Sequence, residues 1–223
     1  MALNLLFFRK ISPDMRKPHT LIICLLAGFL FIFSSNIPPD GPKVILCFGN
    51  SITAGHGLDP EFAYPYLLEQ MLRERGYNYK VINSGLSGET SAGGLTRIDW
   101  VLRDKVDIFI LELGANDGLR GLPLIQTRSN LGLIIKKVRK KYPDAQIVIA
   151  GMMVPPNMGN EYSTEFIYMF NELATEHNAL LIPFLLDGVG GIPELNLNDG
   201  IHPNIEGHKI VAENIFEFIK DIL

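Results

Sequence analysis

The segment VILCFGNSITAG, residues 44–55, combines an apolar run with a polar turn. Val44–Phe48 is short and wholly apolar, which is typical of a strand buried on both faces of a parallel sheet. Gly49 ends this run, and Ser51 follows in a turn towards a helix. The turn lacks the lysine of a phosphate-binding loop and the pattern G-x-S-x-G, since residue 53 is Thr. On this segment alone, Ser51 is best interpreted as a helix-capping serine.

Strands and helices alternate along the rest of the chain. The patterns predict further strands at 80–83, 107–113, 145–150 and 180–183, and helices at 65–75, 90–103, 124–142, 165–177 and 205–222. Five such repeats, with strands too short for a sandwich, predict an α/β fold in which helices cover both faces of a five-stranded parallel sheet. We find no repeat and no linker after Pro42, so residues 37–223 are expected to form one domain.

In such a sheet, functional residues lie in the loops at the carboxyl ends of the strands. The loop 84–90 contains Gly88, and the loop 114–118 contains Asn116. Gly88 suits either a backbone that approaches a ligand or an ordinary tight turn. Asn116 suits either a donor to a developing oxyanion or an Asx-turn.

The loop 198–204 places Asp199 three residues before His202, just ahead of a helix. One turn can then present a carboxylate that orients an imidazole and an imidazole that deprotonates a hydroxyl. The other histidines of the body, His56, His177 and His208, are interpreted as solvated or structural.

Taken together and in this order, the four loops resemble the SGNH hydrolases, also called GDSL lipases and esterases, over nearly all of residues 43–223. The matching stretches are GNSIT at 49–53, Gly88, GAND at 114–117 and DGIHP at 199–203. The stretch LELGANDGLRG at 111–121 is similar to the branch of bacterial periplasmic arylesterases, lysophospholipases and thioesterases.

The resemblance implies a flavodoxin-like three-layer α/β/α sandwich and a serine hydrolase without metal or cofactor. Ser51 would be the nucleophile, His202 its general base and Asp199 the carboxylate that orients the imidazole. The oxyanion hole would consist of Ser51, Gly88 and Asn116. The chain departs from the family at Asn50, where Asp is usual; Asn adds two donors and removes a charge.

The loop 152–160 follows the fourth predicted strand and opens at the same sheet edge as Ser51. Its apolar side chains are costly to expose, and flexible thioethers suit apolar ligands of varied shape. Met153, Val154, Pro155 and Met158 are therefore predicted to bind the acyl group. The alternative is that these side chains only cover the end of the sheet.

Composition excludes other classes of protein. Residues 37–223 contain 16 basic and 23 acidic residues, a net charge of −7, which argues against binding to nucleic acid. Two cysteines give neither a disulfide framework nor a thiolate metal site, and Cys47 is expected to be inert packing.

The segment 1–36 has the pattern of an export signal. Four basic residues precede an apolar run at 21–33, and small and polar residues follow it. The run has 13 residues, fewer than the roughly 20 of a membrane-spanning helix. We expect a periplasmic or secreted protein; the alternative is an uncleaved membrane anchor at 21–33.

The sequence therefore predicts an exported serine esterase that acts on a small-molecule ester, thioester or lipid with a lipophilic acyl or aryl group. Two alternatives stay open. One is a polysaccharide or carbohydrate O-deacetylase on the same fold. The other is a catalytically inactive SGNH-fold binding protein, for which Asn50 is the support.

Overall fold

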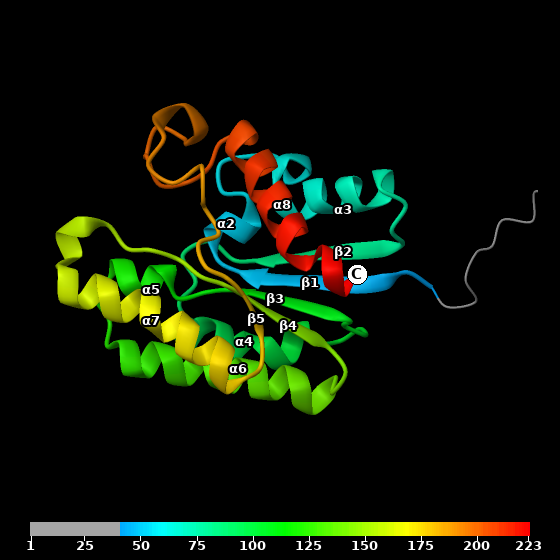
Figure 1. Cartoon of the computed structure of the whole chain (residues 1–223), viewed down its shortest axis with the longest axis horizontal. Helices are drawn as coiled ribbons and strands as arrows, with labels where there is room; N and C mark the ends of the chain where they lie inside the picture. The colour runs from blue at the N-terminus through cyan, green and yellow to red at the C-terminus, as the bar shows by residue number, and fades with distance from the viewer. Residues whose placement is uncertain (1–40) are drawn as a thin grey trace, which may run out of the picture. The chain divides into compact units, whose positions relative to one another are not determined.

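The computed structural model describes residues 41–223, so the predicted export signal at 1–36 lies outside the described residues. Its sheet has five parallel strands in the order β2-β1-β3-β4-β5 (Figure 1). These strands are β1 (Lys43–Gly49), β2 (Tyr79–Gly85), β3 (Ile108–Glu112), β4 (Gln146–Ala150) and β5 (Leu180–Ile182). The predicted five-stranded parallel sheet is confirmed, and its strand order is that of flavodoxin-like folds.

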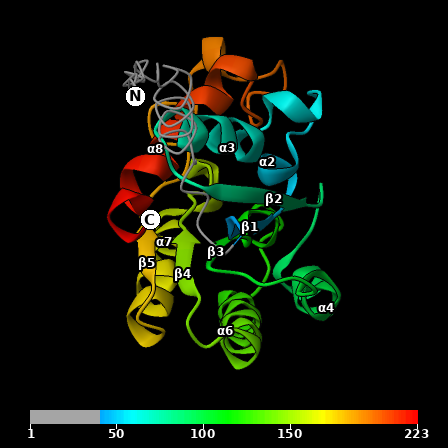
Figure 2. The ribbon, with the colours of Figure 1, turned by 90° about the vertical axis from the view of Figure 1, so that its right-hand side faces the viewer.

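Helices cover both faces of the sheet, which gives the three-layer sandwich (Figures 1 and 2). One face holds α3 (Tyr64–Glu74) and α8 (Ile205–Ile219); the other holds α4 (Ser91–Val101), α6 (Leu124–Lys141) and α7 (Asn160–Glu176). The short helices α2 (Ser51–Ala54) and α5 (Ala115–Leu119) directly follow β1 and β3. Single 3-10 turns are η1 (Pro60–Phe62), η2 (Pro156–Met158), η3 (Pro193–Leu195) and η4 (Lys220–Ile222).

Two predicted helix boundaries are wrong. Helix α7 begins at Asn160, five residues before the predicted start, because its polar first turn lacks the apolar period that begins at Phe166. Helix α8 ends at Ile219, and η4 takes the place of the predicted last turn. No helix within 41–223 is long and apolar enough to cross a membrane.

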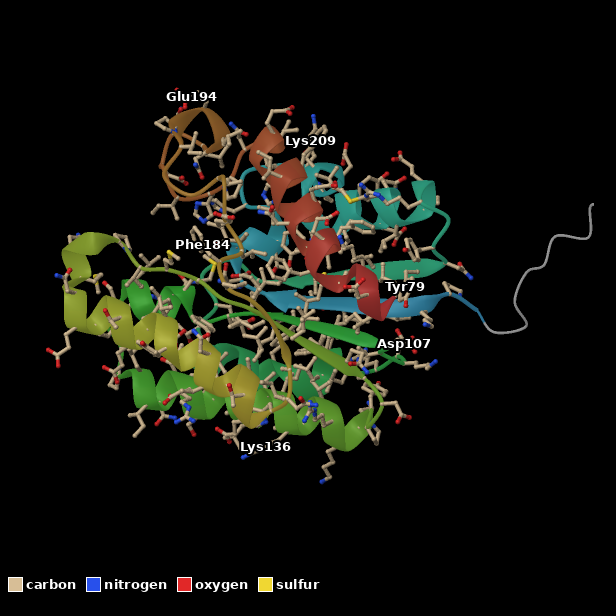
Figure 3. All side chains as sticks on the ribbon, viewed as in Figure 1. Tyr79, Asp107, Lys136, Phe184, Glu194 and Lys209 are labelled. Carbon is tan, nitrogen blue, oxygen red and sulfur yellow. The ribbon has the colours of Figure 1, made fainter. Side chains whose placement is uncertain are left out.

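The core lies on both faces of the central strands. The side chains of Phe48 and Phe109 stack with ring centroids 5.8 Å apart, and both are fully buried. Cys47 is a buried free cysteine, and burial raises the pKa of its thiol to about 12, so it packs as an inert side chain, as predicted. Charged side chains such as Lys136 and Lys209 point away from the sheet (Figure 3).

Candidate active site

The predicted catalytic residues lie where the strand order reverses, at the carboxyl ends of β1 and β3. Ser51 is the first residue of α2, directly after β1, and Asn116 belongs to α5, directly after β3. Neighbouring parallel strands on opposite sides of such a point leave a crevice in which α/β proteins bind ligands. The fold therefore brings these two loops together at the place expected for a site.

Ser51, His202 and Asp199 form a continuous chain of hydrogen bonds. The Oγ of Ser51 lies 2.9 Å from Nε2 of His202, although the two residues are 151 positions apart. On the other side of the ring, Nδ1 of His202 lies 2.7 Å from Oδ2 of Asp199. With a proton on Nδ1, the ring donates to Asp199 and accepts the hydroxyl proton of Ser51 at Nε2. This arrangement can deprotonate a serine hydroxyl as it attacks a carbonyl carbon.

The Asp199 loop holds its own geometry. Oδ1 of Asp199 accepts the backbone N–H groups of Ile201, at 2.9 Å, and of His202, at 3.0 Å. These two hydrogen bonds lower the pKa of Asp199 to about 2, so the carboxylate is ionised throughout the neutral range. Gly200, between them, has a φ of +69°, which favours glycine. The Asp199 side chain is 40% exposed.

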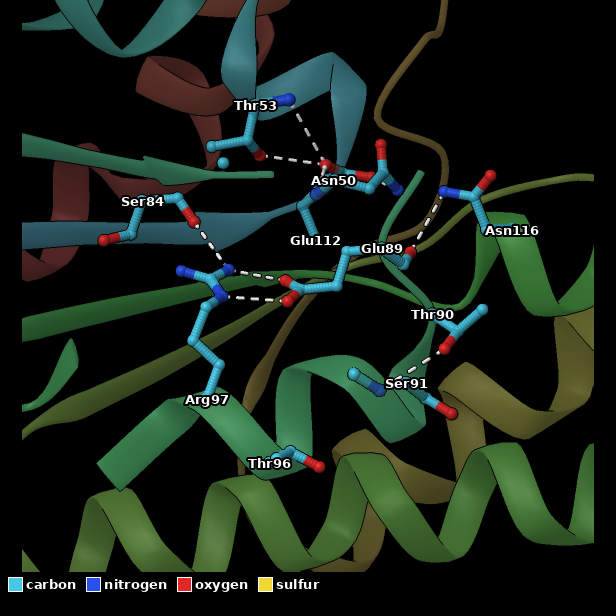
Figure 4. Close-up of polar contacts among 12 residues, drawn as sticks. Asn50, Thr53, Ser84, Glu89, Thr90, Ser91, Thr96, Arg97, Glu112 and Asn116 are labelled. Carbon is cyan, nitrogen blue, oxygen red and sulfur yellow. Dashed lines mark hydrogen bonds and ion pairs between the residues drawn. The ribbon is translucent and has the colours of Figure 1, made fainter. Parts of the chain in front are cut away.

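Asn116 lies against the loop that contains Gly88. Its Nδ2 donates to the backbone oxygen of Glu89 at 3.0 Å (Figure 4). Because an amide group has two N–H donors, the second can serve an oxyanion. Among the described residues, no backbone N–H donates to Oδ1 of Asn116, so the Asx-turn interpretation is not realised. Gly88 is exposed at a φ of +78°, and a Cβ there would meet nothing within 4 Å.

Two buried acids hold this loop in place, and sequence reasoning missed both. Asp117 accepts the N–H of Ser91 at 2.8 Å and its hydroxyl at 2.6 Å. Glu89 pairs with Arg97, whose Nε lies 2.8 Å from Oε1 and whose Nη2 also donates to the backbone oxygen of Ser84 (Figure 4). Asp117 ends the GAND motif and Glu89 directly follows Gly88, but their partners Ser91 and Arg97 lie on helix α4.

Helix α2, which begins at Ser51, is capped by the side chain of Asn50. The Oδ1 of Asn50 accepts the N–H of Ile52 at 3.0 Å, and its Nδ2 donates to Oε1 of Glu112 at 2.6 Å. Asn50 is 1% exposed and Glu112 is fully buried. The helix-capping interpretation of Ser51 is therefore wrong, and its hydroxyl faces His202 instead.

The predicted acyl-binding residues differ in exposure. Met153 is 47% exposed and Pro155 is exposed, whereas Met158 is half-buried against the core. Val154 is buried and packs with Phe166 over Gly118, where a Cβ would lie 2.6 Å from Val154 Cγ1. The loop thus both covers the sheet end and offers side chains to solvent, and acyl binding stays a prediction.

His56 lies beside the predicted catalytic residues, with its ring centroid 4.5 Å from that of His202. Ligand atoms of His56, Asp199 and His202 lie within 4.8 Å of one another, so these residues could hold a metal ion. An ion that bound His202 through Nε2 would compete with Ser51 for the imidazole. His208 is buried, as a structural histidine should be; burial lowers its pKa to about 4, and its Nδ1 accepts the N–H of Tyr64 at 3.2 Å.

Comparisons with known proteins agree with this geometry. Residues 47–210 match the GDSL-like Lipase/Acylhydrolase family. The chain is 37% identical to the esterase TesA of Pseudomonas aeruginosa over 81% of this chain and 90% of that protein. It is 36% identical to an arylesterase of Vibrio mimicus, over 86% of this chain and 95% of that protein. It is 32% identical to the thioesterase 1/protease 1/lysophospholipase L1 of Escherichia coli K12, over 83% and 87% of the two chains.

A crystal structure of TesA superposes with a TM-score of 0.78 at 37% identity, covering 81% of this chain and all of that one. A family match over most of the chain and relatives at this level of identity show the family. The chain therefore belongs to the GDSL-like lipase/acylhydrolase family, the SGNH hydrolases, and is a carboxylic ester hydrolase.

Proposed function

We propose that this protein is an exported serine esterase that hydrolyses esters or thioesters with lipophilic acyl or aryl groups through an acyl-enzyme on Ser51. The observation on which this proposal depends most is the hydrogen-bonded chain from Ser51 through His202 to Asp199. Export is proposed from the sequence of residues 1–36, which has a basic flank followed by a short apolar run.

The reaction follows from the donors and acceptors of this chain. Ser51 Oγ attacks the carbonyl carbon while its proton passes to Nε2 of His202, and Asp199 stabilises the imidazolium. The oxyanion is bound by the backbone N–H groups of Ser51 and Gly88 and by the second amide N–H of Asn116. His202 then protonates the leaving oxygen or sulfur. In the second half, His202 deprotonates a water that attacks the acyl carbon and releases Ser51.

Exposed apolar side chains in the catalytic loops support a lipophilic substrate. Leu86 precedes Gly88 by two residues, Ile201 precedes His202, Met153 lies in the loop after β4, and Leu119 ends α5, the short helix after β3; all four are exposed. Apolar side chains gathered around a site mark the binding of apolar ligands, because exposing them to water is unfavourable. We expect the half-buried Met158 to contact a longer acyl chain.

The test is a hydrolysis profile over p-nitrophenyl esters from acetyl to palmitoyl, with a palmitoyl thioester and a lysophospholipid added. We expect kcat/KM to rise with chain length beyond acetyl, by at most about fourfold per buried methylene, since each is worth about 0.8 kcal/mol. Met158→Gln should then reduce octanoyl hydrolysis more than acetyl hydrolysis, whereas Leu133→Gln on the exposed surface of α6 should change neither. Activity on acetyl esters alone would contradict the lipophilic substrate and favour the deacetylase.

A further inference from the structure

Glu112 is a fully buried carboxylate directly beneath the nucleophile turn, and the reaction above does not use it. It accepts hydrogen bonds from the backbone N–H of Asn50 at 3.0 Å and from the amide of Asn50 at 2.6 Å. It also accepts from the N–H of Thr53 at 3.3 Å and from its hydroxyl at 2.8 Å (Figure 4). One side chain of β3 thus holds both ends of the turn that contains Ser51.

The Glu112 carboxylate lies close against Gly49, the residue before Asn50. A Cβ on Gly49 would lie 2.5 Å from Oε2 of Glu112, 2.1 Å from Oγ1 of Thr53 and 2.8 Å from the backbone oxygen of Glu112, so any larger residue at position 49 would displace this carboxylate. The N–H of Asn50 also lies 3.2 Å from the backbone oxygen of Glu112, so the carboxylate shares this donor with the backbone of β3.

The orientation of the Asn50 amide is set by the helix that follows. Its Oδ1 accepts the N–H of Ile52 at 3.0 Å and lies 3.3 Å from Oγ of Ser51. A reversed amide would turn its NH₂ group towards the N–H of Ile52, two donors facing each other. The NH₂ group is therefore directed at Glu112, and its donors do not titrate.

We propose, on the basis of the proposed function, that Glu112 is a positioning residue for Ser51 and that Asn50 keeps the hydrogen bonds between Glu112 and the turn intact at alkaline pH. An aspartate at position 50 would have to share a proton with Glu112, and this proton would be lost at alkaline pH. Two carboxylates at the 2.6 Å separation of this pair cannot both be ionised in a buried site. Asn50 replaces the shared proton by a permanent N–H.

Within residues 41–223, the other titratable groups near Glu112 make no hydrogen bond to its Oε1 atom, which faces Asn50. Cys47 on β1 and Tyr64 on α3 are fully buried, burial raises both of their pKa values, and His208 on α8 is buried next to Tyr64. The hydroxyl groups of Tyr64 and Thr53 lie 2.9 Å apart, and either can donate. The Oε2 end of Glu112 can therefore adapt to gain or loss of a proton, and burial raises the pKa of this carboxyl to about 7. The Oε1 end, which faces Asn50, meets only a donor.

The experiment compares Asn50→Asp, Glu112→Gln and the double variant across pH 5 to 10, with kcat, KM and the unfolding temperature measured at each pH. In Asn50→Asp, kcat should stay near the wild-type value at low pH. It should fall by on the order of tenfold to a hundredfold towards pH 10, with little change in KM, as misplacement of a reacting group does. In Glu112→Gln, either orientation of the new amide turns its NH₂ group towards donors, those of the Asn50 side chain or the N–H groups of the turn, so kcat should fall by a similar factor at every pH.

The double variant gives the most direct test, because it exchanges the hydrogen-bond donor at position 50 with the acceptor at position 112. The new amide at position 112 can donate to the new carboxylate at position 50, while its oxygen accepts from the turn. We expect kcat within about tenfold of wild type and no alkaline loss beyond that of wild type, a rescue that a merely structural role would not produce. If Asn50→Asp does not fold, folding and activity of the double variant still support the pairing.

Two results would overturn the proposal: an Asn50→Asp profile that superimposes on that of wild type up to pH 10, or a double variant no better than the worse single variant. Asn171→Asp, which adds the same charge on exposed α7, should leave the profile unchanged. If wild type itself hydrolyses no ester, the proposed function fails; if wild type is active and Asn50→Asp is unaltered, only this inference fails.

Discussion

The turn that holds Ser51 and the loop that holds His202 meet in one hydrogen bond, yet they are supported differently. Ser51 follows the inner strand β1, and its turn is held by Glu112, which is fully buried on the neighbouring strand β3. His202 lies in a loop that is held by hydrogen bonds from its own backbone to Asp199, whose side chain is 40% exposed.

This difference separates two ways of fixing a catalytic group. A buried carboxylate fixes the turn of the proposed nucleophile to the core, so the position of Ser51 depends on the sheet and on a desolvated charge. A short loop with an internal Asp turn fixes the base locally, and the solvent-exposed carboxylate costs little to ionise. Substitutions on the two sides should therefore separate catalysis from stability.

Asp199→Asn is expected to have the largest effect. The new Oδ1 can still accept the N–H groups of Ile201 and His202, so the loop persists. Its NH₂ group, however, faces Nδ1 of His202 and favours the wrong ring tautomer. We expect kcat to fall by on the order of 10⁴ with an almost unchanged unfolding temperature. Glu194→Gln, an exposed carboxylate nearby in sequence, is the control. A loss of only a few-fold would mean that a group other than Asp199 orients the imidazole.

Asn116→Ala extends the comparison to the proposed oxyanion hole. It tests whether Asn116 acts mainly in catalysis, as expected for the His202 loop, or also in stability, as expected for the Ser51 turn. One N–H of the Asn116 amide donates a hydrogen bond to the backbone oxygen of Glu89 and so connects two loops. We expect the second N–H to act chiefly in the transition state. Steady-state kinetics should show kcat lower by roughly 10²–10³ and KM little changed. Asn171→Ala on α7 is the matched control. A change confined to KM would assign Asn116 to substrate binding.

The two carboxylates should give opposite pH dependence of stability, which is the smallest effect. The folded-state pKa of Glu112, raised by burial to about 7, lies above its ordinary value of 4.5, so folding is favoured by the bound proton. The free energy of unfolding should then fall by on the order of 1–3 kcal/mol as pH rises from about 4.5 to 7. Asp199, whose pKa is lowered to about 2, contributes stability above its ordinary pKa of 3.8 and loses it as pH falls through 2.

Urea unfolding at a series of pH values checks this contrast. Glu112→Gln should flatten the decline between pH 4.5 and 7, and Asp199→Asn should leave that decline in place. A wild-type protein equally stable at pH 5 and pH 7.5 would show that Glu112 does not gain a proton on folding.

The sequence was sufficient to predict the sheet and which loop residues would lie together. Buried parallel strands such as Ile108–Glu112 are nearly continuous apolar runs, and side chains that gather at their carboxyl ends stand out in loops of Gly and Asn. The structure brings Ser51, Asp199 and His202 together as the motifs predicted.

The support of the site could not be predicted in the same way. Glu112 lies inside a strand pattern, and its partner Asn50 is 62 residues away, so neither local propensity nor spacing indicates the contact. Helices α2 and α5 are too short to show a period of 3.6 residues. A pattern of apolar residues such as Met158 does not identify the substrate that these residues would contact.

The most direct test of the account is covalent labelling of the nucleophile. Wild-type protein treated with a fluorophosphonate should gain one adduct by intact-mass spectrometry, and peptide mapping should place it on Ser51. Ser51→Ala should remain unlabelled and inactive while it keeps the wild-type unfolding temperature. An adduct on another residue, or a folded and ester-hydrolysing protein that is not labelled at all, would contradict the assignment of Ser51 as the nucleophile.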